Sequence, residues 1–205
     1  MQNSRVSRPS GVVSFNSAAF DEACAALMRL VVQDGCPDAL IGIRTGGLYV
    51  AQSMAKAAGY TVPVLTITCR RPSTEYKIRL SALKKVVTRL PRPIVDRLRM
   101  IEHAVLTRKP QSIQPSDFQF DANELVAFDD WLDRAGGRPS LVIVDDAIDS
   151  GATISRVLDL VSRRVPPATK IRSAVVTVTT PHPLILPDYT LFCQQLCRFP
   201  WSLDA

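Results

Sequence analysis

Apolar residues along the chain alternate between short continuous runs and longer stretches at helical spacing. The short runs predict strands over residues 39–43, 62–68, 141–144 and 171–179. The helical spacing predicts helices from Ser17 to a stop at Gly35, over 48–58, from about Asp121 to 135, and from about Thr153 to 164. Strands that alternate with helices favour a mostly parallel, doubly wound α/β sheet with helices on both faces.

Residues 141–154, LVIVDDAIDSGATI, combine a buried strand, two adjacent carboxylates, a glycine turn and a helix start. In open α/β sheets the carboxyl ends of the strands face the ligand crevice. Asp145 and Asp146 at that end could accept hydrogen bonds from a sugar diol or hold a hydrated Mg²⁺. The following loop and the first N–H groups of the helix form a site suited to a phosphate dianion. The competing interpretation is an ordinary turn with a helix cap.

A second strand, glycine loop and helix occur at residues 39–58, where the strand ends in the sequence RTGG. A plain strand-to-helix turn would explain this loop by itself. Beside the first motif, a second anion site on the same edge of the sheet becomes the better interpretation.

The order of apolar strand, DDxxDSGxT and helix resembles the phosphoribosyl pyrophosphate (PRPP) motif of the type I phosphoribosyltransferases. The resemblance implies that Asp145 and Asp146 contact the ribose hydroxyls and, through PRPP, the cofactor Mg²⁺. It implies a loop for the 5-phosphate formed by Asp149, Ser150, Gly151, Ala152 and Thr153. In the purine-salvage branch, the acid at the position of Asp149 is also the candidate proton acceptor.

The loop IGIRTGG resembles the pyrophosphate loop of the same family. The resemblance implies that Arg44, Thr45, Gly46 and Gly47 bind pyrophosphate, with a non-proline cis peptide near Arg44 and Thr45.

The C-terminal stretch, about residues 180–205, resembles the small base-binding hood of the xanthine, guanine and hypoxanthine phosphoribosyltransferases, since PDY and FPW are both present. Those enzymes place a lysine where this chain has Thr179, Thr180 and Pro181, and a stacking aromatic where it has Leu196. The candidate base-binding residues are Thr180, Tyr189, Leu196 and Trp201, and packing within an irregular hood is the alternative role.

Residues from about 70 to 120 interrupt the strand-helix alternation and predict a helical insertion. Between Arg70 and Lys109 there are twelve Lys or Arg against three acids, a local charge of +9 in a chain of net charge +6. This basic face could attract PRPP, mediate assembly into a homodimer or higher homo-oligomer, contact nucleic acid, or simply be solvated.

The 205 residues, with 46% hydrophobic content, fit one domain over 1–205. The sequence has no apolar run of bilayer length, no signal peptide, and an odd number of cysteines, so a cytoplasmic protein without a membrane partner is expected. The function predicted is Mg²⁺-dependent transfer of phosphoribosyl from PRPP to a nitrogen acceptor, such as a nucleobase, with release of pyrophosphate. The alternative is a PRPP-sensing or nucleic-acid-binding regulator on the same fold.

Overall fold

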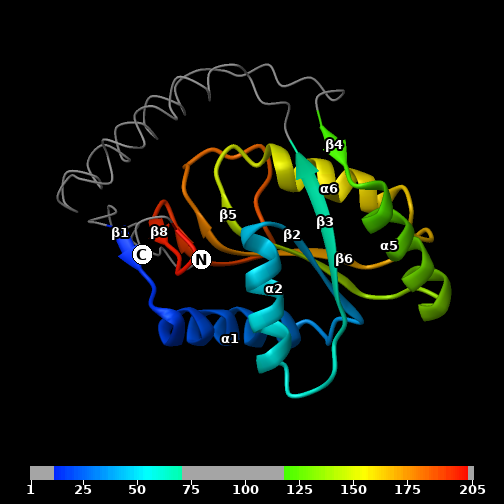
Figure 1. Cartoon of the computed structure of the whole chain (residues 1–205), viewed down its shortest axis with the longest axis horizontal. Helices are drawn as coiled ribbons and strands as arrows, with labels where there is room; N and C mark the ends of the chain where they lie inside the picture. The colour runs from blue at the N-terminus through cyan, green and yellow to red at the C-terminus, as the bar shows by residue number, and fades with distance from the viewer. Residues whose placement is uncertain (1–11, 71–117, 203–205) are drawn as a thin grey trace, which may run out of the picture.

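The computed structural model describes residues 12–70 and 118–202, and within them a six-stranded sheet forms the centre of the molecule (Figure 1). The order across the sheet is β4, β3, β2, β5, β6 and β7. These strands span Gln119–Phe120 (β4), Val64–Arg70 (β3), Ala39–Arg44 (β2), Leu141–Ile148 (β5), Ile171–Val178 (β6) and Tyr189–Cys193 (β7). Every neighbouring pair is parallel except β3 and β4. The predicted mostly parallel sheet is therefore confirmed.

Helices cover both faces of this sheet (Figure 1). Helices α1 (Ser17–Gln33) and α2 (Gly46–Ala57) pack on one face, and α5 (Ala122–Ala135) and α6 (Ala152–Ser162) pack on the other. Asn16 caps α1 by accepting a hydrogen bond from the Ala19 N–H at 2.8 Å, and Asp121 caps α5. Among the described residues, no helix has both the length and the apolar character required to cross a membrane.

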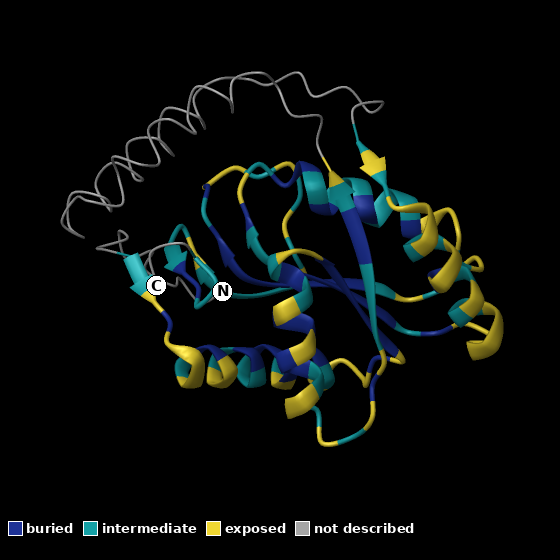
Figure 2. Cartoon of the chain, in the orientation of Figure 1, coloured by how far each residue is buried: buried dark blue, intermediate teal, exposed yellow. Residues whose placement is uncertain are grey.

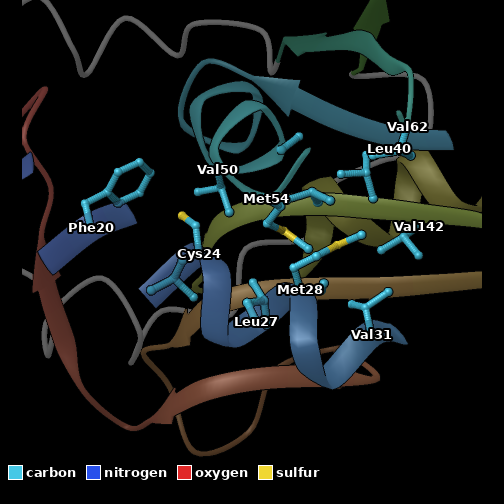
Figure 3. Packing of buried hydrophobic residues seen from close by; sticks show 14 of the residues in the cluster. Phe20, Cys24, Leu27, Met28, Val31, Leu40, Val50, Met54, Val62 and Val142 are labelled. Carbon is cyan, nitrogen blue, oxygen red and sulfur yellow. The ribbon is translucent and has the colours of Figure 1, made fainter. Parts of the chain in front are cut away.

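Each face of the sheet has its own apolar core, and the central strands between the two are largely buried (Figure 2). On the α1 and α2 face, Leu27, Met28 and Met54 interdigitate between the helices and the sheet (Figure 3). Side chains buried on both faces explain the continuous apolar runs of β2 and β5, as expected for parallel strands.

Two boundaries that bear on the site differ from the sequence prediction. Strand β5 continues to Ile148 instead of ending at Val144, because residues beyond Val144 still pair with β6 after the pairing with β2 has ended. Helix α2 begins at Gly46 instead of residue 48. The predicted helical insertion falls mainly on residues 71–117, which lie outside the described residues.

The stretch after Thr180 was predicted to be irregular; residues 181–188 are irregular, but two strands that the prediction missed follow them. Strand β7 joins the main sheet beside β6, and β8 (Leu196–Arg198) pairs in parallel with β1 (Val12–Ser14) in a separate two-stranded sheet. These strands are too short for a periodic signal, Pro187 and Pro200 lie close to them, and their pairing partners are distant in the sequence.

A buried arginine connects the amino-terminal end of β6 to the carboxyl-terminal end of α1 through hydrogen bonds. Arg172, whose exposed fraction is 4%, donates to the carbonyls of Val31 and Gly35, each at 2.9 Å, and to the Ser140 hydroxyl at 3.0 Å. It also donates to the Tyr189 hydroxyl at 3.2 Å. These bonds hold helix, loop and two strands together at the edge of the sheet opposite the predicted site.

We expect Arg172→Met to lower the free energy of unfolding by about 2–4 kcal/mol, since several buried acceptors would lose their donor. Lys170→Met is the matched control, because exposed Lys170 donates to the Asp34 carbonyl at 2.7 Å and should cost less than about 1 kcal/mol. Urea unfolding of both variants measures the difference, and equal small losses would contradict the role given to Arg172.

Candidate functional site

Strands β2 and β5 lie side by side, but the helices that follow them cover opposite faces of the sheet. Helix α2 packs on one face and α6 on the other, so the two connecting loops diverge at the carboxyl ends of adjacent strands (Figure 1). In open α/β sheets this reversal of direction creates the crevice in which ligands bind. Both predicted anion loops therefore meet at one site.

The carboxylates of Asp145 and Asp146 belong to the last part of β5, not to the loop after it. The Asp145 carboxylate accepts from the N–H of Asp146 at 3.0 Å, and the Asp146 carboxylate accepts from the N–H of Ala147 at 3.0 Å. Because β2 no longer pairs with β5 here, this part of β5 is bordered by the glycine loop that follows β2.

The loop after β2 contains the predicted non-proline cis peptide between Arg44 and Thr45, which confirms that expectation. The two glycines that follow, Gly46 and Gly47, form the first residues of α2 and lie close against β5. A Cβ on Gly46 would overlap the Asp146 carboxylate, and one on Gly47 would overlap the Val144 carbonyl oxygen. Glycine is thus required at Gly47 by the close approach of the two backbones, whereas a side chain at Gly46 would displace the Asp146 carboxylate.

The loop after β5 leads into α6 through Gly151, whose φ of +81° favours glycine. The N-cap residue Gly151 has no side chain to cap α6, and the Ser150 hydroxyl accepts from the Ala152 N–H at 3.4 Å. The Leu184 N–H donates to the Ser150 carbonyl at 2.9 Å, so the hood packs against this loop. The predicted phosphate loop thus lies at a helix N-terminus behind a glycine turn, an arrangement that suits an anion.

Burial raises the pKa of the Asp146 carboxyl, and this effect exceeds the opposing hydrogen bonds from the neighbouring groups. A divalent cation would offset that cost by favouring the ionised form. Two carboxylates beside a narrow glycine loop are too few ligands for a cation held by protein alone, and no cluster of three or more metal-binding side chains occurs in residues 12–70 and 118–202. The donor set fits Mg²⁺ that is held mainly by substrate oxygens and water.

Asp149 follows the last residue of β5 and lies next to the end of β6. The Thr179 hydroxyl is 3.2 Å from both the Asp149 carboxylate and the Ile148 carbonyl, and can donate to either. Thr180, which follows, is buried. Thr179 thus borders the acidic side chain predicted to accept a proton.

The structure does not bring all four predicted base-binding residues to this point. The Tyr189 hydroxyl donates to Asp34 at 2.6 Å and accepts from Arg172, at the opposite end of β6 from Asp149. The Trp201 ring stacks on that of Phe199, with 5.0 Å between ring centroids, and lies against Tyr49, with 4.9 Å between centroids. These rings belong to an aromatic cluster over α1 and α2. We therefore leave Tyr189 out of the base site and assign Trp201 to packing.

Leu196 lies on β8 between Gln195 and Cys197, and both of these residues contact Thr177 on β6. The Gln195 carbonyl accepts from the Thr177 hydroxyl at 2.6 Å. Burial, together with the negative charge of Asp146, raises the pKa of the Cys197 thiol to about 11, against the effect of the Thr177 hydroxyl. The proximity of Cys197 to Asp146 had no signal in the sequence.

Glu124 is a further residue that sequence reasoning missed. Its carboxylate accepts from Arg44 Nη1 at 3.2 Å and from the Thr68 hydroxyl at 3.0 Å, as well as from the Thr68 N–H. A glutamate in the first turn of a helix has an ordinary structural explanation, so only the folded arrangement reveals this contact with the glycine loop.

No protein-family model matches the sequence, and no curated protein matches it either. Solved structures do match. A purine phosphoribosyltransferase from Pyrococcus horikoshii Ot3 is 19% identical, with 92% of each chain covered and a TM-score of 0.54. The xanthine-guanine-hypoxanthine phosphoribosyltransferase of Helicobacter pylori is 16% identical, with 94% of each chain covered and a TM-score of 0.56. A hypothetical protein from Neisseria gonorrhoeae with bound ppGpp is 14% identical over 97% of this chain and 93% of its own, with a TM-score of 0.56.

These similarities show that the chain has the type I phosphoribosyltransferase fold, as the sequence predicted. At this level of identity they establish the fold and leave the activity to be tested.

We expect Asp146→Asn to stabilise the protein near neutral pH. Burial raises the pKa of Asp146 in the folded state. The contribution of this side chain to the free energy of unfolding is therefore complete below the pKa of the unfolded state and is lost as pH rises through the pKa of the folded state. An amide avoids that loss, and each kcal/mol gained should raise the melting midpoint by about 2–4 °C. The advantage should disappear at acid pH, where the wild-type carboxyl is protonated.

Thermal unfolding across a pH series measures this effect. Asp133→Asn, which neutralises an exposed carboxylate on α5, is the control and should show no comparable pH-dependent gain. A midpoint for Asp146→Asn that falls below that of wild type near neutral pH would contradict the account.

Proposed function

We propose that this protein transfers the 5-phosphoribosyl group of PRPP to a nitrogen acceptor and releases pyrophosphate. The observation that carries this proposal is the meeting of two anion loops and an acidic pair between adjacent strands β2 and β5. A substrate with phosphate groups at two ends and a diol between them matches that order of residues.

The 5-phosphate would bind in the loop formed by residues 149–153, from Asp149 to Thr153. The N–H groups at the start of α6 would donate to its oxygens, and the hydroxyls of Ser150 and Thr153 could turn to serve as further donors. The positive end of the α6 dipole favours a dianion there. This contact would fix one end of the substrate without taking part in bond breaking.

The ribose hydroxyls would donate to Asp145 and Asp146. Mg²⁺ bound to PRPP would neutralise charge on the pyrophosphate as it leaves. Arg44 and the backbone of Thr45, Gly46 and Gly47 would hold the pyrophosphate oxygens, since the loop passes directly beside the acidic pair. The C1–O bond to pyrophosphate would break while a bond from C1 to the acceptor nitrogen forms.

The acceptor would lie near Asp149, which would receive its proton. The Thr179 hydroxyl, 3.2 Å away, can orient this carboxylate, and Thr180 and Leu196 are the remaining candidates for contacts with a nucleobase. With threonine at 179, the site offers a neutral hydroxyl group beside Asp149. We propose a cytoplasmic homo-oligomer that acts in nucleotide salvage.

A regulator that binds a phosphorylated nucleotide without turnover is the second candidate. The observation that favours it is the similarity to the Neisseria gonorrhoeae protein solved with bound ppGpp. The same two anion loops could hold the separated phosphate groups of such a ligand. In that case ppGpp would compete with PRPP for this site.

Incubation of the protein with PRPP, Mg²⁺ and a panel of purine and pyrimidine bases tests the proposal. We expect pyrophosphate release that depends on one class of base, with a nucleotide product identified by mass spectrometry. Binding of PRPP or ppGpp by calorimetry with no product from any base would instead support the regulator. Strongly salt-dependent binding of RNA or DNA would support a nucleic-acid role for such a regulator.

We expect Asp149→Asn to reduce kcat by about 10²–10⁴-fold, the usual contribution of a general base, while PRPP affinity changes little. The amide can still accept from Thr179 but cannot receive the proton of the acceptor. Single-turnover kinetics and calorimetry with PRPP separate the two effects. Asp159→Asn on the exposed side of α6 is the control, and full activity in Asp149→Asn would remove Asp149 from the mechanism.

A further inference from the structure

The Glu124 carboxylate joins three elements at one point next to the glycine loop. Glu124 lies in the first turn of α5, and its side chain is only 16% exposed. It accepts from the N–H and the hydroxyl of Thr68 on β3, and from the guanidinium of Arg44 on β2 at 3.2 Å. Arg44 and Thr68 are register partners in the parallel pair of β2 and β3. The carboxylate therefore connects the last two residues that pair between β2 and β3.

The position of Glu124 is itself fixed by the start of its helix. The Asp121 carboxylate accepts from the N–H of Asn123 at 3.0 Å and approaches that of Glu124 at 3.4 Å, which sets the first turn of α5. Contacts between α5 and β3 then hold the helix against the sheet. Glu124 thus presents a stationary acceptor to a more exposed partner.

Arg44 is that partner, and its side chain is 56% exposed. A guanidinium has five N–H donors, and within the described part of the chain Glu124 accepts from one nitrogen, Nη1. The other donors remain available to a ligand. Arg44 is also the residue directly before Thr45, Gly46 and Gly47, so it lies at the start of the loop proposed to bind pyrophosphate.

We propose that Glu124 is a positioning residue that holds the Arg44 guanidinium ready to bind the pyrophosphate group of PRPP. This inference rests on the proposed function. A long exposed arginine loses rotamer freedom when it binds a ligand, and a contact that restricts it beforehand reduces that loss. Glu124 acts through Arg44 and does not touch the substrate. If Glu124 served only to accept the hydrogen bonds of Thr68 on β3, its replacement would leave ligand affinity unchanged as long as the fold is intact.

Glu124→Gln tests this proposal because glutamine keeps one oxygen to accept from Thr68 but loses the charge that attracts Arg44. Calorimetry with Mg²⁺ present would compare two probes, pyrophosphate and ribose 5-phosphate. We expect the affinity for pyrophosphate to fall about three- to tenfold, in line with the loss of one charge-assisted contact that orients the arginine. Affinity for ribose 5-phosphate, which lacks the pyrophosphate group, should be unchanged.

The matched control is Asp129→Asn on the same helix. Asp129 accepts from Arg164 Nη1 at 2.6 Å, so this variant also removes an acid paired with arginine, but that arginine lies in the turn after α6 and not in the glycine loop. It should bind both probes as wild type does. A double-mutant cycle with Arg44→Met adds a second check, since Glu124→Gln should cause no further loss of pyrophosphate affinity when Arg44 is absent.

Two results would overturn the inference. Unchanged affinity of Glu124→Gln for pyrophosphate would show that Arg44 needs no support from Glu124. Equal loss for pyrophosphate and ribose 5-phosphate would show a general structural role instead. Failure of the wild-type protein to bind either PRPP or pyrophosphate would be a different outcome, because it would remove the proposed function on which the inference depends.

Discussion

The close packing of Gly46 and Gly47 against the end of β5 is the constraint on which the site depends. Any Cβ on these residues would overlap the Asp146 carboxylate or the Val144 carbonyl. Because the loop has no side chains at these points, its backbone can lie directly beside the two carboxylates of β5. A ligand held by the loop must therefore also meet the acidic pair, which couples an anion site to a site for hydroxyls or a hydrated cation.

This arrangement has an electrostatic cost, which neighbouring hydrogen bonds partly offset. Burial raises the pKa of Asp146, which means that the folded protein disfavours the ionised form of this carboxyl when no ligand is bound. At the opposite end of the sheet, the buried Arg172 has a structural role, since it donates to backbone carbonyls and holds α1 to β6. Stability and ligand binding are thus separated between the two ends of the strands, which agrees with the general position of ligand sites in open α/β sheets.

Much of the fold was predictable because buried parallel strands and amphipathic helices leave a periodic record in the sequence. The runs at 39–43 and 141–144 and the helices at 17–33 and 122–135 were recognised from their own residues. Strands β7 and β8 were not, because three to five residues carry no clear period and their partners are distant in sequence. The length of β5 was also underestimated, since its last residues are held by pairing with β6 alone.

For the site, the sequence by itself determined the chemistry: the acidic pair, Asp149, and the two glycine loops occur as contiguous motifs whose residue types suit phosphate and diol binding. Only the tertiary structure decided which other residues join them. It put Tyr189 at the far end of β6, brought Cys197 near Asp146, and placed Glu124 against Arg44, which precedes it by 80 residues. Contacts inside a motif follow from local spacing, whereas contacts between distant segments depend on strand order and helix packing, which local residues do not encode.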